Sequence, residues 1–169
     1  MTLWLIVSHA LAYGVILSGV MFTSILGLVR INPEIMLNDY PPDIQAKYGP
    51  MSEQSKRQRL PVAIFFIVVL LGIVAISFLR VRTNAGNDIP FVTAFVHLFV
   101  MFSVFNLLDW LVLDWLIVVA IRPSFIVLPG TEGMAGYQDY GFHFRGFLVG
   151  MLITLVTSIV VAGIVAVLF

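Results

Sequence analysis

The amino-acid sequence predicts an all-α fold, a polytopic integral membrane protein built as a bundle of four transmembrane helices. Two observations support this prediction. Of the 169 residues, 60% are hydrophobic and only 11% are charged, whereas soluble domains carry roughly a quarter charged residues. The chain also contains four apolar runs long enough to cross a bilayer core, which needs roughly 20 residues in a helix.

Each predicted span follows from one apolar run. The first run has no charged residue, the second is closed by the basic stretch RVR, the third is apolar apart from two aspartates, and the fourth is uncharged. A helix satisfies its own backbone hydrogen bonds, as the membrane interior requires. The predicted spans are residues 2–29, 60–79, 89–121 and 146–169, within a single membrane domain.

The connecting segments 30–59 and 122–145 must lie on one side of the membrane, with both termini on the other. These two segments hold seven Lys and Arg residues, against Arg80 and Arg82 in the short connection between them. Cytoplasmic loops carry the excess of basic residues. We therefore expect a multi-pass protein of the cell membrane with both long segments in the cytoplasm and both termini outside.

Several classes of function have no support in the sequence. Nine basic residues balance nine acidic ones, so the charge does not indicate a nucleic-acid partner. The chain has no cysteine, which excludes thiolate metal ligands and thiol nucleophiles. No phosphate-binding loop, dinucleotide motif or metal-binding motif is present, so we predict no metal site and can name no cofactor.

Residues 105–119 place two aspartates in a strongly apolar run, and the dipeptide Asp-Trp occurs there twice, five residues apart. In an α-helix, Asp109 and Asp114 would lie about 140° apart around the axis and about 7.5 Å apart along it. A proton-sharing pair on one helix face is therefore not expected. With Ser103 and Asn106 they would form a wide polar sector that faces the bundle interior or a water-filled mouth.

These aspartates have three competing interpretations. They form part of a proton or ion pathway through the bilayer, they anchor the helix at the cytoplasmic interface and pair with Arg122 or Arg145, or they line a site there. In the third interpretation Asp109 or Asp114 acts as a base and His143 as its partner, and these three are the candidate catalytic residues. The site would draw further residues from the two long segments, which the topology brings to the same end. The candidate ligand-binding residues are Asp39, Asn106, Trp110, Glu132, Asp139, Tyr140 and Arg145.

Two histidines lie within the predicted spans, at similar depth near the outer side. His9 and His97 could in principle ligate haem axially from adjacent helices. Interhelical hydrogen bonding explains single buried histidines more simply, and it is the preferred interpretation.

Small residues repeat every four positions on the first and last spans. On the last span they are Gly146, Gly150, Thr154, Ser158, Ala162 and Ala166, and on the first they are Gly19, Thr23 and Gly27. Such stripes let helix backbones approach closely. We expect packing within the bundle, with a homo-oligomer interface as the alternative.

The sequence defines no reaction. It favours a protein that binds a membrane lipid or an amphipathic small molecule at a polar site on the cytoplasmic interface. Two alternatives remain open: a small membrane enzyme acting on such a substrate, and a proton- or ion-coupled transporter working as an oligomer.

Overall fold

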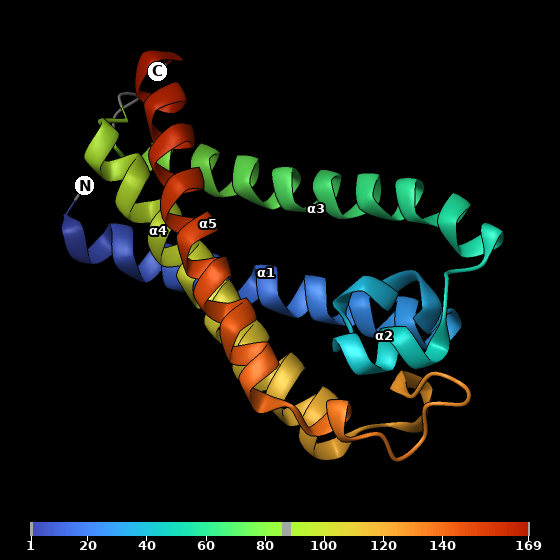
Figure 1. Ribbon diagram of the computed structural model, residues 1–169. Coiled ribbons are helices and arrows are strands. Elements are labelled where there is room, and N and C mark those ends of the chain that lie inside the picture. The colour runs from blue at the N-terminus through green and yellow to red at the C-terminus, as the bar shows by residue number, and fades with distance from the viewer. Residues whose placement is uncertain (1, 86–88, 169) are drawn as a thin grey trace.

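The computed structural model describes residues 2–85 and 89–168, and within these ranges it contains helices and no strand. The long helices are α1 (Leu3–Ile31), α3 (Glu53–Ala85), α4 (Phe91–Leu108) continuing into η2 (Asp109–Ile121), and α5 (Tyr140–Leu168), as Figure 1 shows. Four helical segments are long and apolar enough to cross a membrane. The predicted all-α fold with four spans is confirmed.

The helix ends differ from the predicted spans. Helix α3 begins at Glu53 and α5 at Tyr140, both ahead of the apolar runs, because polar residues extend a helix as readily as apolar ones. Helix α3 also continues to Ala85, through half of the connection expected at 80–89. The remainder of that connection includes residues 86–88, which lie outside the described residues, as does Phe169 at the end of the fourth predicted span.

Helix α4 packs along both α1 and α5, whereas α3 contacts mainly α1 and does so over a smaller area (Figure 1). The helices lie close together at the end that carries both termini, and toward the opposite end α1 and α3 diverge from α4–η2 and α5. Buried residues at the narrow end include Ala10, Leu98, Met101 and Ala162. The divergence leaves room between α1, η2 and α5 at the wide end.

Residues 32–52 and 122–139 fold together over the wide end, and we call them the cap. The cap contains the short helices η1 (Pro33–Asp39), α2 (Pro42–Tyr48), η3 (Ser124–Ile126) and η4 (Ala135–Gln138). Its two halves share a hydrophobic core, and the Tyr40 hydroxyl donates a hydrogen bond of 2.7 Å to the carbonyl oxygen of Ile126. The backbone of the second half of the cap approaches Asp43 closely at Gly136. A Cβ at position 136 would overlap the Asp43 carboxylate.

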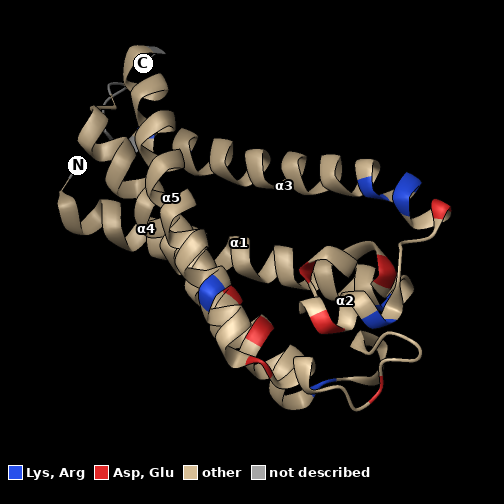
Figure 2. Cartoon of the chain, viewed as in Figure 1, with Lys and Arg blue, Asp and Glu red and all other residues tan. Residues whose placement is uncertain are grey.

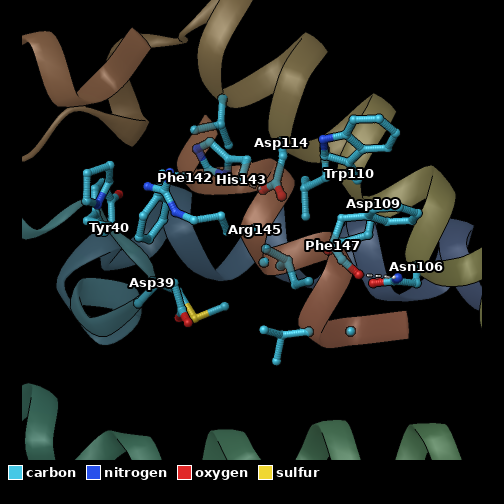
Figure 3. A pocket seen from close by; sticks show the side chains of 18 of the residues that line it. Asp39, Tyr40, Asn106, Asp109, Trp110, Asp114, Phe142, His143, Arg145 and Phe147 are labelled. Carbon is cyan, nitrogen blue, oxygen red and sulfur yellow. Dashed lines mark hydrogen bonds and ion pairs between the residues drawn. The ribbon is translucent and has the colours of Figure 1, made fainter. Parts of the chain in front are cut away.

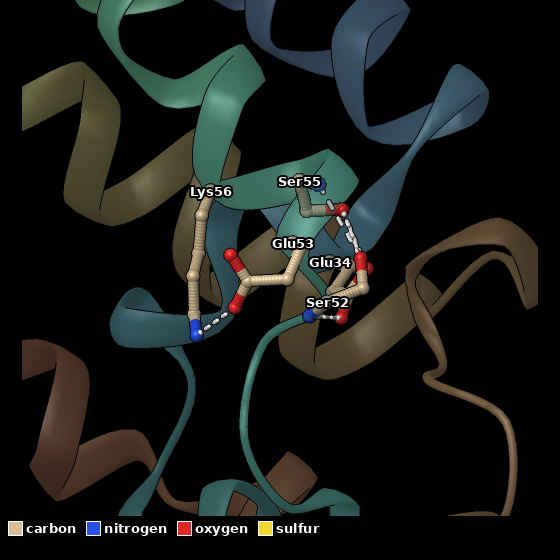
Figure 4. Close-up of polar contacts among 5 residues, drawn as sticks. All are labelled: Glu34, Ser52, Glu53, Ser55 and Lys56. Carbon is tan, nitrogen blue, oxygen red and sulfur yellow. Dashed lines mark hydrogen bonds and ion pairs between the residues drawn. The ribbon is translucent and has the colours of Figure 1, made fainter.

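Hydrogen bonds to Glu34 link the start of α3 to the cap (Figure 4). Its carboxylate accepts hydrogen bonds from the Ser52 backbone N–H and from the hydroxyls of Ser52 and Ser55. Burial opposes ionisation, but these hydrogen bonds hold the pKa of Glu34 below its ordinary value. A carboxylate at this position also interacts favourably with the N-terminal end of the helix dipole.

The segment η2 is a π-helix of 13 residues, in which each N–H bonds to the carbonyl five residues earlier. The Arg122 N–H closes the last of these bonds, at 2.8 Å to the carbonyl oxygen of Ile117. Arg122 has φ of 45°, a left-handed conformation that ends the helix before Pro123. π-Helices are rare and occur mostly as single turns at functional sites. The residues of η2 are therefore candidates for a functional site.

The small-residue stripes divide between inside and outside. Thr154, Ser158 and Ala162 of α5 are buried within the bundle, in keeping with the packing interpretation. Gly19 and Gly27 of α1 have no neighbour within 4 Å of an added Cβ. The homo-oligomer therefore remains a prediction, and it concerns the outer face of α1.

Apolar side chains cover the outer surface of the helices. Helix α3 exposes Leu60, Ile64, Phe65, Val68 and Leu71 along its length, and such a continuous apolar surface suits lipid rather than water. Figure 2 shows the acidic and basic residues gathered around the cap, with long uncharged stretches on the helices beyond it. Fold and surface together define a multi-pass membrane protein.

Candidate functional site

A cavity of about 720 Å³ lies at the wide end of the bundle, beneath the cap. Its apolar walls come from α1, η2 and α5, and they include Ile25, Leu26, Val29, Val118, Val149 and Ile153. Its polar lining comes from the cap, η2 and the first turns of α5 (Figure 3). The volume falls within the range of small-molecule sites, which are mostly apolar with a few placed polar groups.

One ionisable pair in the cavity joins η2 to α5. The Nδ1 atom of His143 lies 3.1 Å from Oδ1 of Asp114, and Figure 3 shows the two side chains directed at each other. Their side chains are only 7% and 24% exposed. A carboxylate on Nδ1 fixes the imidazole tautomer and orientation and leaves Nε2 as the proton acceptor.

Asp109 and Asp114 line the same cavity, as expected for two members of one polar sector. The π-helix reduces their angular separation below that of an α-helix, because its hydrogen bonds join residues five apart and bring positions 109 and 114 to nearly the same face. The indole rings of Trp110 and Trp115, also five apart, lie 4.5 Å apart between centroids. The alternative pairing with Arg122 or Arg145 is not found, since no ion pair in the described part of the chain joins either aspartate to an arginine.

Asp39 reaches the cavity from the cap and gives it a third carboxylate. Its side chain is open to the cavity but surrounded by protein, and this burial raises the pKa of its carboxyl. The negative charge of Asp114 raises this pKa further, while the positive charge of Arg59 opposes the shift. The folded protein therefore resists ionisation of Asp39.

The raised pKa of Asp39 predicts a loss of stability with increasing pH. The protonated form is favoured by folding, so the stability is complete below the ordinary pKa of 3.8 and falls as the pH rises through the folded-state pKa. We expect Asp39→Asn to melt at a higher temperature than the natural chain at about pH 8 and at a similar temperature near about pH 4. Thermal unfolding in detergent across this range measures the difference. A variant that melts lower at the higher pH would contradict the prediction.

Asn106 and Trp110 also line the cavity. The Asn106 amide donates a hydrogen bond of 3.0 Å to the carbonyl oxygen of Phe147, and a Cβ on Gly150 would overlap that amide. The Trp110 ring stacks on Phe147 with 4.6 Å between centroids. These contacts join α4–η2 to α5 and form one wall of the site. Ser103, the first residue of the expected polar sector, does not line the cavity.

Three predicted site residues lie outside the cavity, and a fourth lies at its edge. Glu132 accepts a hydrogen bond from the backbone of Gly130 in a turn, and Tyr140 is exposed. Asp139 accepts a hydrogen bond of 2.8 Å from the Phe142 N–H and lies 3.7 Å from Arg145. Arg145 lines the cavity but is 69% exposed.

The structure adds aromatic residues that were not among the predicted site residues. Tyr40, Tyr137, Phe142 and Phe147 line the cavity. Tyr40 and Tyr137 meet edge to face, 6.1 Å apart between centroids, in the core of the cap. Burial raises the pKa of the Tyr40 hydroxyl, which therefore stays a hydrogen-bond donor. The density of aromatic residues in the two connecting segments was the sequence signal for them.

His9 and His97 lie at the narrow end, and neither of them lines the cavity. Their rings are in contact, with 5.2 Å between centroids, and His97 Nε2 lies 3.1 Å from the Ser77 hydroxyl oxygen. Axial ligation of one haem would require its macrocycle between the two rings, and the ring contact leaves no such space. The two histidines do not fit a haem, and the contacts of His97 join α4 to α1 and α3.

The fold and the cavity beneath the cap describe a multi-pass membrane protein with a candidate binding site. Comparison with known proteins adds no family to this description. No protein-family model matches the chain, and no curated protein or solved structure matches it either.

Proposed function

We propose that the protein binds an amphipathic molecule, a membrane lipid or a small molecule with a hydrocarbon chain, in the cavity beneath the cap. The observation that carries this proposal is the division of the cavity lining. The carboxylates come from the cap and η2 and the imidazole of His143 from the first turn of α5, whereas α1 and the later turns of α5 contribute aliphatic walls such as Leu26 and Ile153. A polar group would meet the first surface and a hydrocarbon chain the second.

The orientation in the membrane belongs to the same proposal. We propose that the cap is cytoplasmic, on the basis of seven basic residues in segments 30–59 and 122–145. Because the chain lacks cysteine, single cysteines can report the topology without background. We expect Glu132→Cys to react with a membrane-impermeant maleimide only after cells are opened, and Thr2→Cys to react in intact cells. The reverse pattern would place the cap outside.

Filling the cavity tests the proposed binding. Gly146 lines the cavity and a Cβ there meets nothing within 4 Å, so Gly146→Phe can occupy the space without a clash at its base. Gly163 lies on the same helix, has equally open space and does not line the cavity, so Gly163→Phe is the matched control.

We expect mass spectrometry of the purified protein to find an amphipathic molecule on the natural chain and on Gly163→Phe, and to find it lost from Gly146→Phe. Equal retention by both variants would contradict binding in this cavity. Circular dichroism checks that both variants remain folded.

A second candidate function is an enzyme that acts on the bound amphipathic molecule. The observation that favours it is the His143–Asp114 pair, in which the carboxylate orients an imidazole that could remove a proton from water or substrate. An enzyme would convert extracted lipid without any ion gradient, and His143→Ala would abolish the conversion while leaving the lipid bound. Binding without conversion would leave only the first proposal.

A further inference from the structure

We infer that the polar group of the bound molecule is an organic cation, an ammonium group attached to a hydrocarbon chain. This inference rests on the proposed binding function and names the charge of its ligand. It begins from the charges that line the cavity: Asp39, Asp109 and Asp114 against the single guanidinium of Arg145, with His143 beside them.

The few basic groups of the cavity are already paired. Arg145 lies 3.7 Å from Asp139, which does not line the cavity, and His143 pairs with Asp114. Within the described residues, no basic nitrogen lies within 4.0 Å of the carboxylate of Asp39 or of Asp109. Asp109 also stands in a membrane span, where a carboxylate requires a partner or access to water. Two carboxylates are therefore free to meet a ligand.

The rest of the lining also suits an organic cation. The rings of Tyr40, Trp110 and Phe142 border the same space, and aromatic faces attract ammonium groups at distances up to about 6 Å. In the described part of the chain, no three Asp, Glu or His side chains lie close enough together to hold a metal ion. Carboxylates that line one cavity without converging on a single point match a bulky ammonium group better than a small ion.

Tryptophan fluorescence provides the test. The chain has three tryptophans, and Trp4, which is 75% exposed at the far end of α1, is removed by Trp4→Phe. The remaining signal comes from Trp110, which lines the cavity, and from Trp115 beside it. A brominated dodecyl chain bound in the cavity will quench both. The probes are brominated dodecyltrimethylammonium, dodecylphosphocholine, dodecylglycerol and laurate, added to the Trp4→Phe protein in nanodiscs.

The expected result is tightest quenching by the trimethylammonium probe. Asp109→Asn should weaken the binding of the trimethylammonium probe by about tenfold, the usual effect of losing one buried charged partner. Arg145→Gln should tighten the binding of the same probe by about two- to threefold, because the variant removes a positive charge that repels the ammonium group. Glu53→Gln, an exposed carboxylate outside the cavity, serves as the control that should change nothing. Asp39→Asn, in the cap rather than in a span, repeats the test if Asp109→Asn fails to fold.

The outcomes separate this inference from the proposed function. If laurate binds most tightly and Arg145→Gln weakens it, or if all probes bind alike and Asp109→Asn has no effect, the cation is wrong while cavity binding stands. If no probe quenches better in the natural cavity than in Gly146→Phe, both proposals fail. If the phosphocholine probe equals the trimethylammonium probe, the ammonium source is a phospholipid headgroup; if it binds much more weakly, the source is a free amine.

Discussion

Gly14→Ala is expected to lower the stability of the folded protein by about 1 to 3 kcal/mol, the usual effect of overpacking a close contact. Helices α1 and α4 meet at this residue. A Cβ at position 14 would lie 2.7 Å from the Cβ of Val104 and 2.8 Å from the carbonyl oxygen of Met101. Neither atom can move without shifting the backbone of α4, so the two helices must separate.

Gly19→Ala on the same helix is the matched control. Position 19 is exposed and has no neighbour within 4 Å of an added Cβ. Alanine there should leave stability unchanged or raise it slightly, because alanine favours a helix more than glycine does. Reversible unfolding in mixed detergent micelles measures both variants. Equal effects at the two positions would show that α1 and α4 are not in close contact at Gly14.

The second large effect is expected for the buried pair His143 and Asp114. His143→Ala and Asp114→Asn should each destabilise the protein, and the double variant should cost little more than either single one. A coupling energy of about 1 to 3 kcal/mol is expected for groups that share a buried hydrogen bond. The reason is that each single change leaves the other polar group buried without its partner.

The exposed pair Arg145 and Asp139 supplies the comparison for this cycle. Its atoms lie 3.7 Å apart, and the side chains are 69% and 43% exposed. Exposed ion pairs contribute little to stability, so the cycle of Arg145→Gln and Asp139→Asn should show almost no coupling. Coupling as large as that of the buried pair would mean that the Arg145–Asp139 pair is held in a far less polar environment than its exposure indicates. An absence of coupling in the His143–Asp114 cycle would remove that pair as an organising contact of the site.

The four spans were predictable because lipid leaves the backbone few alternatives to a helix. Their ends were not, since residues such as Glu53 and Tyr140 begin helices with no apolar signal to mark the start. The close contact between α1 and α4 was also missed. It occurs at Gly14, outside the four-residue repeat of Gly19, Thr23 and Gly27, because a periodic pattern records which positions are small and not which face meets a neighbour.

Much of the candidate site could be found from topology, which brings the two connecting segments to the end of the span that carries the aspartates. The predicted residues that line the cavity are Asp39, Asn106, Asp109, Trp110, Asp114, His143 and Arg145. Glu132, Asp139 and Tyr140 do not line it. The two carboxylates are engaged in turn and helix-start hydrogen bonds, and composition cannot distinguish a local partner from a ligand.

The relation between Asp109 and Asp114 could not be derived from α-helical spacing, because the helix there is wider. The five-residue repeat of Asp-Trp was the only indication in the sequence. It matches the spacing of the hydrogen bonds in η2, and only the structure shows that the repeat and the helix share one period.

That shared period bears on how relatives of this chain would be recognised. Loss of one residue between the two aspartates would reduce their spacing from five to four, and an ordinary α-helix places residues four apart on one face. A distant relative could therefore present the same pair of carboxylates from a span one residue shorter. In an alignment without gaps, one aspartate of that relative would be out of register and the correspondence hidden. A search for relatives should accordingly allow a single-residue gap between positions 109 and 114.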